Sequence, residues 1–256
     1  MSDRALQDQV IRALADAPFR ASAQWRKRGL VDPDRLERYA RFVARHFYYE
    51  RIVHFFKYSR ALARITGRPP EAVLPGPAFD ALLPTAVLGS RETAVRVAGL
   101  VAAHVRAGGP YPAIPYLDDL LAYEETMMVV EAGPRIWRDG ADPGAAKSGE
   151  RYPPARVEGT ELLELAHDLP AILPQLLQPW TEVPQAPLRA TRLLVARSRH
   201  GRVAVARPDQ STARVLDLAD GTRTPEQLAR AAGLDPRDLD AALQGLLELG
   251  AVRFSA

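Results

Sequence analysis

The sequence predicts an α+β protein in which an all-α N-terminal domain is followed by a C-terminal winged helix-turn-helix domain. Apolar residues recur at helical spacing through the first half of the chain. A stretch rich in turn-forming residues then indicates a linker. After it comes the pattern of a β-hairpin, three short helices and a strand. We therefore expect domains over residues 1–140 and 155–256, joined by a linker over residues 141–154.

The N-terminal helices are predicted from their apolar spacing and from their ends. A short amphipathic helix comes first, with an apolar stripe of Leu6, Val10, Ile11 and Leu14. Asp32 followed by Pro33 is typical of an N-cap and the first position of a helix, and helical spacing continues from there to Thr66. Gly67 then ends this second helix.

Two more helices follow in the N-terminal domain. Ser90 is a typical N-cap residue, and Gly108 with Gly109 ends the helix that it begins. Pro115 opens another long helix, which extends as far as Ala132. The whole N-terminal domain is therefore expected to be helical.

Two of these helices carry polar residues on their apolar sides. On a wheel centred on Phe42, the residues His46, Glu50 and His54 lie one turn apart on the apolar face. The apolar residues of that face are Tyr39, Val43, Phe47 and Val53. In the helix that Pro115 opens, two acids, Glu124 and Glu131, lie on the side that leucine and methionine residues define. Those residues are Leu117, Leu120, Leu121, Met127 and Met128.

These polar residues allow two interpretations. Inward-facing His and Glu side chains build di-iron sites in helical proteins. The residues available for such a site are His46, Glu50, His54 and Glu124. The alternative is a buried hydrogen-bonded network in which Glu50 or Glu124 pairs with Arg45 or Arg51. Because structural ion pairs resemble functional carboxylates, we adopt the network and assign no metal ligand and no catalytic residue.

The C-terminal domain begins with two short elements and a hairpin. Residues 160–165 form either a strand or a short helix, and residues 170–178 form a short helix. The packing side of that helix is Ile172, Leu173, Leu176 and Leu177. Two apolar runs over residues 193–196 and 203–206, joined through residues 199–202, predict a β-hairpin.

Three short helices and a last strand complete this domain. Helical spacing predicts helices over residues 211–219, 225–232 and 236–249, and a strand follows over residues 252–254. A hairpin with three helices is the arrangement of a winged helix-turn-helix domain. Such a domain binds nucleic acid through its third helix or a peptide along its hairpin edge.

Composition and charge limit the possible functions. The chain has no cysteine, which excludes disulfides and thiolate chemistry, and it has no apolar run that would span a membrane. Its N-terminus lacks a signal-peptide pattern, so we expect a cytoplasmic protein with no membrane partner. Residues 20–68 contain 13 Lys and Arg against four acids, and residues 189–207 contain six arginines and no acid. These basic stretches indicate an anionic partner or a solvated face.

The two surfaces of the predicted winged helix differ in charge. The third helix begins with Asp235, Asp238 and Asp240, which would repel phosphates in a DNA groove, so nucleic acid is not an expected partner. An extended acidic peptide would instead add to the hairpin edge by β-augmentation. The residues that we assign to this peptide site are Arg197, Arg202, Val203, Val205, Arg207, Leu239 and Leu243.

Motifs in the C-terminal domain resemble those of PqqD. They are the turn Asp220-Gly221-Thr222, the run Glu226-Gln227-Leu228-Ala229 and the ending Leu246-Leu247-Glu248-Leu249-Gly250. PqqD typifies the recognition element that binds leader peptides of ribosomally made, post-translationally modified peptides. The resemblance therefore implies a PqqD-like peptide-binding domain.

The N-terminal domain is similar to the HvfC/BufC-type helical partner proteins. The similar segments are residues 47–52, 65–67 and 114–124, together with Phe79. Those proteins accompany multinuclear non-haem iron enzymes of barrel fold that oxidise cysteines in peptide substrates. The resemblance implies a heterodimer with such an enzyme, with iron in the partner and no cofactor in this chain.

Together the two resemblances imply a non-catalytic subunit that binds the leader of a precursor peptide and presents it to the iron enzyme in natural-product biosynthesis. Two other functions stay open at this point. One is a DNA-binding winged-helix regulator. The other is a helical di-iron oxidase, which would use His46, Glu50, His54 and Glu124.

Overall fold

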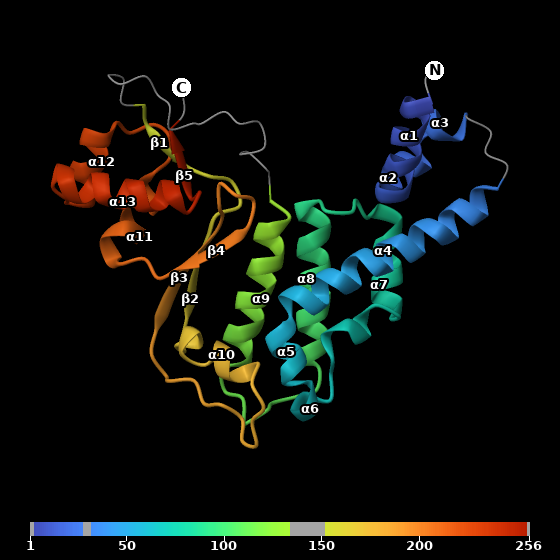
Figure 1. The fold of residues 1–256 in the computed structure, drawn as a ribbon, viewed down its shortest axis with the longest axis horizontal. Helices are drawn as coiled ribbons and strands as arrows, with labels where there is room; N and C mark the ends of the chain where they lie inside the picture. The colour runs from blue at the N-terminus through green and yellow to red at the C-terminus, as the bar shows by residue number, and fades with distance from the viewer. Residues whose placement is uncertain (1–2, 28–31, 134–151, 255–256) are drawn as a thin grey trace. The chain divides into compact units, whose positions relative to one another are not determined.

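The structure is a mixed α+β protein with a helical N-terminal region and small antiparallel sheets (Figure 1). It is a computed structural model, and the residues that it describes are 3–27, 32–133 and 152–254. No helix in these ranges is long and apolar enough to cross a membrane.

The chain divides into two compact units. The first contains Met1–Met128 and Ile172–Gln185, and the second contains Val129–Ala171 and Ala186–Ala256. The segment of residues 172–185 thus joins the N-terminal helices, although the C-terminal domain was predicted to begin at residue 155. The predicted linker over residues 141–154 lies outside the described residues as far as residue 151.

Three short helices open the first unit: α1 (Asp3–Ala15), α2 (Ala17–Ala21) and α3 (Ala23–Arg26). Asp16 and Ser22 separate them, because each side chain accepts a backbone hydrogen bond and caps the helix that follows. The predicted apolar stripe of α1 is not its buried face. Leu6 and Ile11 are exposed, whereas Ala13 is buried.

The long helix α4 (Pro33–Phe55) begins where the sequence predicts, with Asp32 accepting the backbone N–H of Arg35 at 2.7 Å. It was expected to continue to Thr66, but it ends at Phe55. Two short helices follow, α5 (Lys57–Ala61) and α6 (Ala63–Thr66). Gly67, with a φ of 65°, ends α6 in the left-handed conformation.

The buried face of α4 is also not the predicted one. Its buried residues are Ala40, Ala44, Tyr48, Ile52 and Phe55. Tyr39 and Phe42, near the centre of the predicted apolar face, have exposed fractions of 54% and 63%. The predicted face was wrong because the wheel was centred on Phe42, which is exposed. The buried face instead follows the four-residue spacing of Ala40, Ala44, Tyr48 and Ile52, and its two alanines permit close helix packing.

Further helices complete the first unit, and only the last residues of α9 belong to the second. They are η1 (Pro70–Val73), α7 (Pro77–Leu82), η2 (Leu83–Thr85), α8 (Arg91–Arg106), α9 (Leu117–Glu131) and α10 (Leu173–Leu176). Ser90 caps α8 as predicted, accepting the backbone N–H of Thr93 at 3.2 Å. The segment that contains α10 is held by the Arg64 guanidinium, which lies 3.1 Å from the centre of the Trp180 ring. The Tyr116 hydroxyl also donates to the Pro184 carbonyl.

The second unit contains two small antiparallel sheets. One pairs β1 (Pro154–Arg156) with β5 (Val252–Phe254). The other has the order β2-β3-β4, and its strands are β2 (Glu161–Leu165), β3 (Thr191–Arg197) and β4 (Val203–Ala206). The predicted hairpin is therefore confirmed as β3 and β4, and residues 161–165 are a strand. A short 3-10 helix, η3 (Leu169–Ala171), follows β2.

Three helices follow the hairpin, close to the predicted bounds: α11 (Gln210–Leu218), α12 (Pro225–Ala232) and α13 (Pro236–Glu248). A side chain caps the start of each of them. Thr224 and Gln227 form a reciprocal capping box at α12, and Asp235 accepts the first backbone N–H groups of α13. Apolar residues of the three helices form one core with Leu194 and Ala196 of β3.

Candidate functional site

The candidate site is the outer edge of β4. This strand lies at the end of the order β2-β3-β4, so among the described residues no strand pairs with its outer edge. An unpaired edge presents backbone N–H and C=O groups that an added strand can bind. The strand predicted to receive a peptide thus has an open outer edge.

The register identifies which residues of β4 present these groups. The Ser198 N–H donates to the Arg202 carbonyl at 2.8 Å and closes the hairpin as a hydrogen-bonded pair. Opposed residues alternate between hydrogen-bonded and non-hydrogen-bonded pairs along an antiparallel ladder. The next pair, Arg197 with Val203, is therefore not hydrogen-bonded, and neither is the pair of Val195 with Val205. Val203 and Val205 consequently direct their backbone groups away from β3.

The tip of the hairpin is exposed and basic. Arg199, His200 and Arg202 lie there with exposed side chains. Gly201 has a φ of 75°, and its N–H donates to the Ser198 carbonyl, which is the geometry of a tight turn that favours glycine. The tip therefore places positive charge at one end of the open edge.

Arg197 does not lie on this exposed surface. Its side chain has an exposed fraction of 8%, and it donates to the backbone carbonyls of Glu131 and Gly133. An arginine that binds the last carbonyls of a helix stabilises the end of that helix. The assignment of Arg197 to the peptide site is therefore corrected to a structural role at the end of α9.

Arg207 is exposed but already paired. The buried carboxylate of Asp168 accepts hydrogen bonds from both Arg207 and Arg189. Two guanidinium groups on one buried carboxylate compensate its charge. Of the three arginines assigned to the peptide site, Arg202 remains the one at the exposed tip of the hairpin.

Leu239 and Leu243 are core residues. Their exposed fractions are 2% and 4%, and they pack with the buried residues of α11, α12 and β3. Their assignment to an exposed groove is therefore corrected. They follow the buried stripe of an amphipathic helix, and sequence spacing does not distinguish that stripe from a ligand groove.

The four residues considered for a di-iron site are not brought together. His46, Glu50 and His54 are exposed on α4, whereas Glu124 is fully buried on α9. Among the described residues, no three or more His, Cys, Asp or Glu side chains are grouped so that they could hold a metal ion. The alternative, a buried hydrogen-bonded network, is found at Glu124 but with other partners than the predicted arginines: Arg45 pairs with Asp80. Glu50 is exposed and therefore belongs to no buried network.

Glu124 instead binds the start of α5. Its Oε1 accepts the N–H of Tyr58 at 2.8 Å and that of Ser59 at 3.2 Å, and its Oε2 is hydrogen-bonded to the Ser59 hydroxyl. Complete burial raises the pKa of Glu124 to about 8, although these hydrogen bonds act in the opposite direction. The carboxyl group is therefore protonated over much of the range in which an exposed glutamate is ionised.

Comparison with known proteins gives no family for this chain. No family model matches the sequence, and no curated protein matches it either.

Proposed function

We propose that the chain is a non-catalytic subunit that binds the leader of a ribosomally made precursor peptide. In this proposal the second unit is a PqqD-like winged helix-turn-helix domain. The order of three strands and then α11, α12 and α13 supports that assignment, as do the PqqD-like motifs in the same segment. The peptide would add to β4 as a further antiparallel or parallel strand.

The observation that carries this proposal is the open edge of β4. Val203 and Val205 direct their backbone groups outward, and Val205 has an exposed side chain. A short edge strand with two outward residues supplies enough backbone groups to set the register of an added strand. Side chains of the peptide then provide specificity.

The charge of the hairpin tip favours an acidic peptide. Arg199 and Arg202 lie at the exposed tip, so acidic residues near one end of the leader would be favoured. The acid at the start of α13 is the helix cap, because Asp235 accepts the backbone N–H groups of Arg237 and Asp238. Its negative charge supports a peptide ligand rather than DNA.

The first unit would dock a barrel-fold multinuclear iron enzyme and so form a heterodimer. This part of the proposal rests on the similarity to HvfC/BufC-type proteins. A row of exposed rings on α4 supports it: Tyr39 stacks on Phe42 with centroids 6.3 Å apart, and Phe42 stacks on His46 at 6.4 Å. Exposed aromatic side chains in one row are typical of protein interaction surfaces. Iron would reside in the partner enzyme.

The peptide site is tested with the full chain and a labelled leader peptide taken from a neighbouring reading frame. Val205→Pro removes an outward N–H without removing a bond to β3, so we expect the affinity for the peptide to fall at least tenfold. Val205→Ala keeps that N–H and should change the affinity less than threefold. Arg202→Glu should weaken binding mainly at low salt, because exposed charges are screened. Fluorescence anisotropy measures all three.

Two results would contradict the proposal. Unchanged peptide affinity in a folded Val205→Pro variant would place the peptide elsewhere. Tight binding of random duplex DNA at moderate salt, with no peptide binding, would favour the regulator instead.

A further inference from the structure

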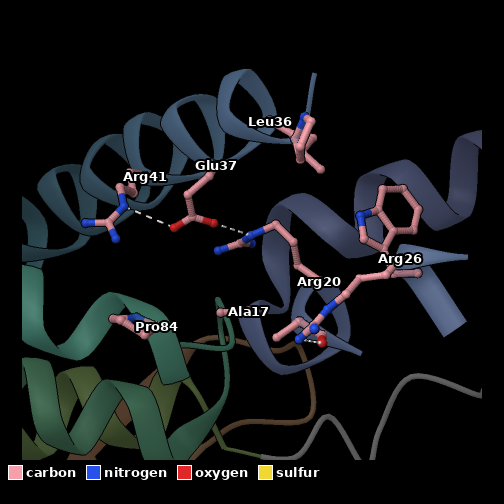
Figure 2. A pocket seen from close by; sticks show the side chains of 10 residues that line it. Ala17, Arg20, Arg26, Leu36, Glu37, Arg41 and Pro84 are labelled. Atoms are coloured by element: carbon pink, nitrogen blue, oxygen red, sulfur yellow. Dashed lines mark hydrogen bonds and ion pairs between the residues drawn. The ribbon is translucent and has the colours of Figure 1, made fainter. Parts of the chain in front are cut away.

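A pocket lies among the N-terminal helices of the first unit, and none of the residues assigned to the peptide site or to the aromatic row of α4 lines it. Its volume is about 550 Å³, and it lies between α2, α3, the start of α4 and η2 (Figure 2). The residues that line it are Ala17, Arg20, Ala21, Trp25, Arg26, Pro33, Leu36, Glu37, Arg41 and Pro84. This volume falls within the range of small-molecule sites in proteins.

Part of the wall is apolar and well packed. Trp25 is buried, and its ring lies 5.7 Å from that of Phe19. These two residues form a small core with Ala13, against which Leu36 of α4 packs. The apolar wall is therefore held in place by packing before any ligand arrives.

The other part of the wall is charged. Figure 2 shows Arg20 and Arg41 reaching the carboxylate of Glu37 from opposite sides, and the Nε atoms donate at 2.7 Å and 3.0 Å respectively. Burial alone would raise the pKa of Glu37, but the hydrogen bonds and charges of the two arginines lower it overall. Arg20 also donates to the Ala13 carbonyl, which fixes its position.

Positive charge exceeds negative charge in this wall. Three lining residues, Arg20, Arg26 and Arg41, carry guanidinium groups, and Glu37 is the one acid among the lining residues. Arg41 uses Nε for Glu37, so its two terminal nitrogens are not part of that hydrogen bond. Arg26 uses a terminal nitrogen for the Ala21 carbonyl. A guanidinium fork matches a carboxylate in shape and charge.

We propose that this pocket binds a small organic acid. The carboxylate would pair with the arginine side of the pocket, chiefly Arg41, and a flat apolar body would lie against the wall that includes Trp25 and Leu36. This inference does not depend on the peptide-binding role of the second unit.

The experiment titrates phenylacetate into the isotope-labelled full chain and follows the indole N–H resonance of Trp25 by NMR. Trp25→Phe identifies that resonance. For a ligand of this size we expect saturable binding with a Kd of about 0.1–10 mM. Arg41→Gln should weaken binding about tenfold through loss of a charged hydrogen bond. Arg41→Lys, which keeps the charge but loses the fork, should have an intermediate affinity.

The matched control is Arg45→Gln, one turn further along α4, where the arginine pairs with Asp80 and does not line the pocket. It should bind phenylacetate like the parent chain. Absence of saturable shifts at Trp25 would overturn the proposal, as would equal weakening by Arg45→Gln. Equal affinity for the neutral phenylacetamide would show that the pocket does not recognise the carboxylate. Tighter binding of phenyl phosphate than of phenylacetate would contradict the proposed ligand class and indicate a phosphate ester instead of a carboxylic acid.

Discussion

Glu124 shows how one buried residue shapes the fold around it. The helical spacing before Thr66 predicts one continuous helix. The N–H groups of Tyr58 and Ser59, however, donate hydrogen bonds to the carboxyl group of Glu124 on another helix. Those N–H groups would otherwise bind carbonyls four residues earlier. The carboxyl group therefore acts as the cap of α5 from a distance of 65 residues along the chain.

The raised pKa of Glu124 predicts a pH dependence of stability. Its ordinary pKa is 4.5 and its pKa in the folded protein is about 8, so between these values the folded chain holds a proton that the unfolded chain has lost. The free energy of unfolding should thus fall as pH rises through this window, by up to about 1.4 kcal/mol per pH unit from this group. Glu124→Gln mimics the protonated carboxyl and should remove that contribution.

Urea denaturation of both proteins across this pH range measures the difference. The parent and Glu124→Gln chains should be similar in stability near pH 4.5, and the variant should become relatively more stable as pH approaches 8. A constant difference at every pH would mean that Glu124 does not titrate in this window.

At the scale of elements, turns and helix ends are set by residues that are near in sequence. Close packing between two elements is set by residues that are distant in sequence. Gly250 follows α13 with a φ of 73°, as a glycine after a helix often does. It also lies against the end of β3: a Cβ there would collide with the Arg197 carbonyl oxygen and lie 3.1 Å from the Cα of Ser198. The hairpin and the last strand are therefore packed together at a position that tolerates no side chain.

Gly250→Ala should destabilise the protein by about 2–4 kcal/mol, because backbone strain at positive φ adds to a steric clash. The matched control is Gly233→Ala at the end of α12. Gly233 has a similar φ of 72°, but a Cβ there would have no neighbour within 4 Å. The control should lose only about 1–2 kcal/mol from backbone strain. Thermal unfolding of both variants measures these losses of stability. Equal losses would show that the backbone near Gly250 relaxes to accommodate the added Cβ.

At the scale of the whole molecule, the proposed role requires a second protein. The exposed rings of α4 and the open edge of β4 belong to different units, so in the proposed role enzyme docking and peptide binding would use separate surfaces. Neither surface contains residues assigned to chemistry. The chain would thus contribute binding, and the partner enzyme would contribute the iron and the reaction.

Co-expression with the barrel-fold iron enzyme should yield one heterodimeric species on size-exclusion chromatography, with iron in the complex and none at stoichiometric level in the isolated chain. Phe42→Asp should weaken the heterodimer at least tenfold, because it places a charge within the aromatic row. Ile11→Asp, at an exposed residue of α1, is the matched control and should leave it intact. Full oxidative activity from the enzyme alone would rule out this role.

The sequence by itself determined the features that depend on neighbouring residues. The caps at Asp32 and Ser90, the hairpin and the three helices after it all follow from local hydrogen bonding and apolar spacing. Such features involve residues only a few positions apart, so a single sequence contains the needed information.

Only the tertiary structure decided which of these faces are buried and which are free. On α4 the alanines face the core and the rings of Tyr39 and Phe42 are exposed, while Arg197 is buried against helix carbonyls instead of flanking an open edge. The partner of Glu124 and the arginine-lined pocket likewise join residues that are distant in sequence. Burial depends on which surfaces other elements cover, and apolar spacing along one helix does not specify its neighbours.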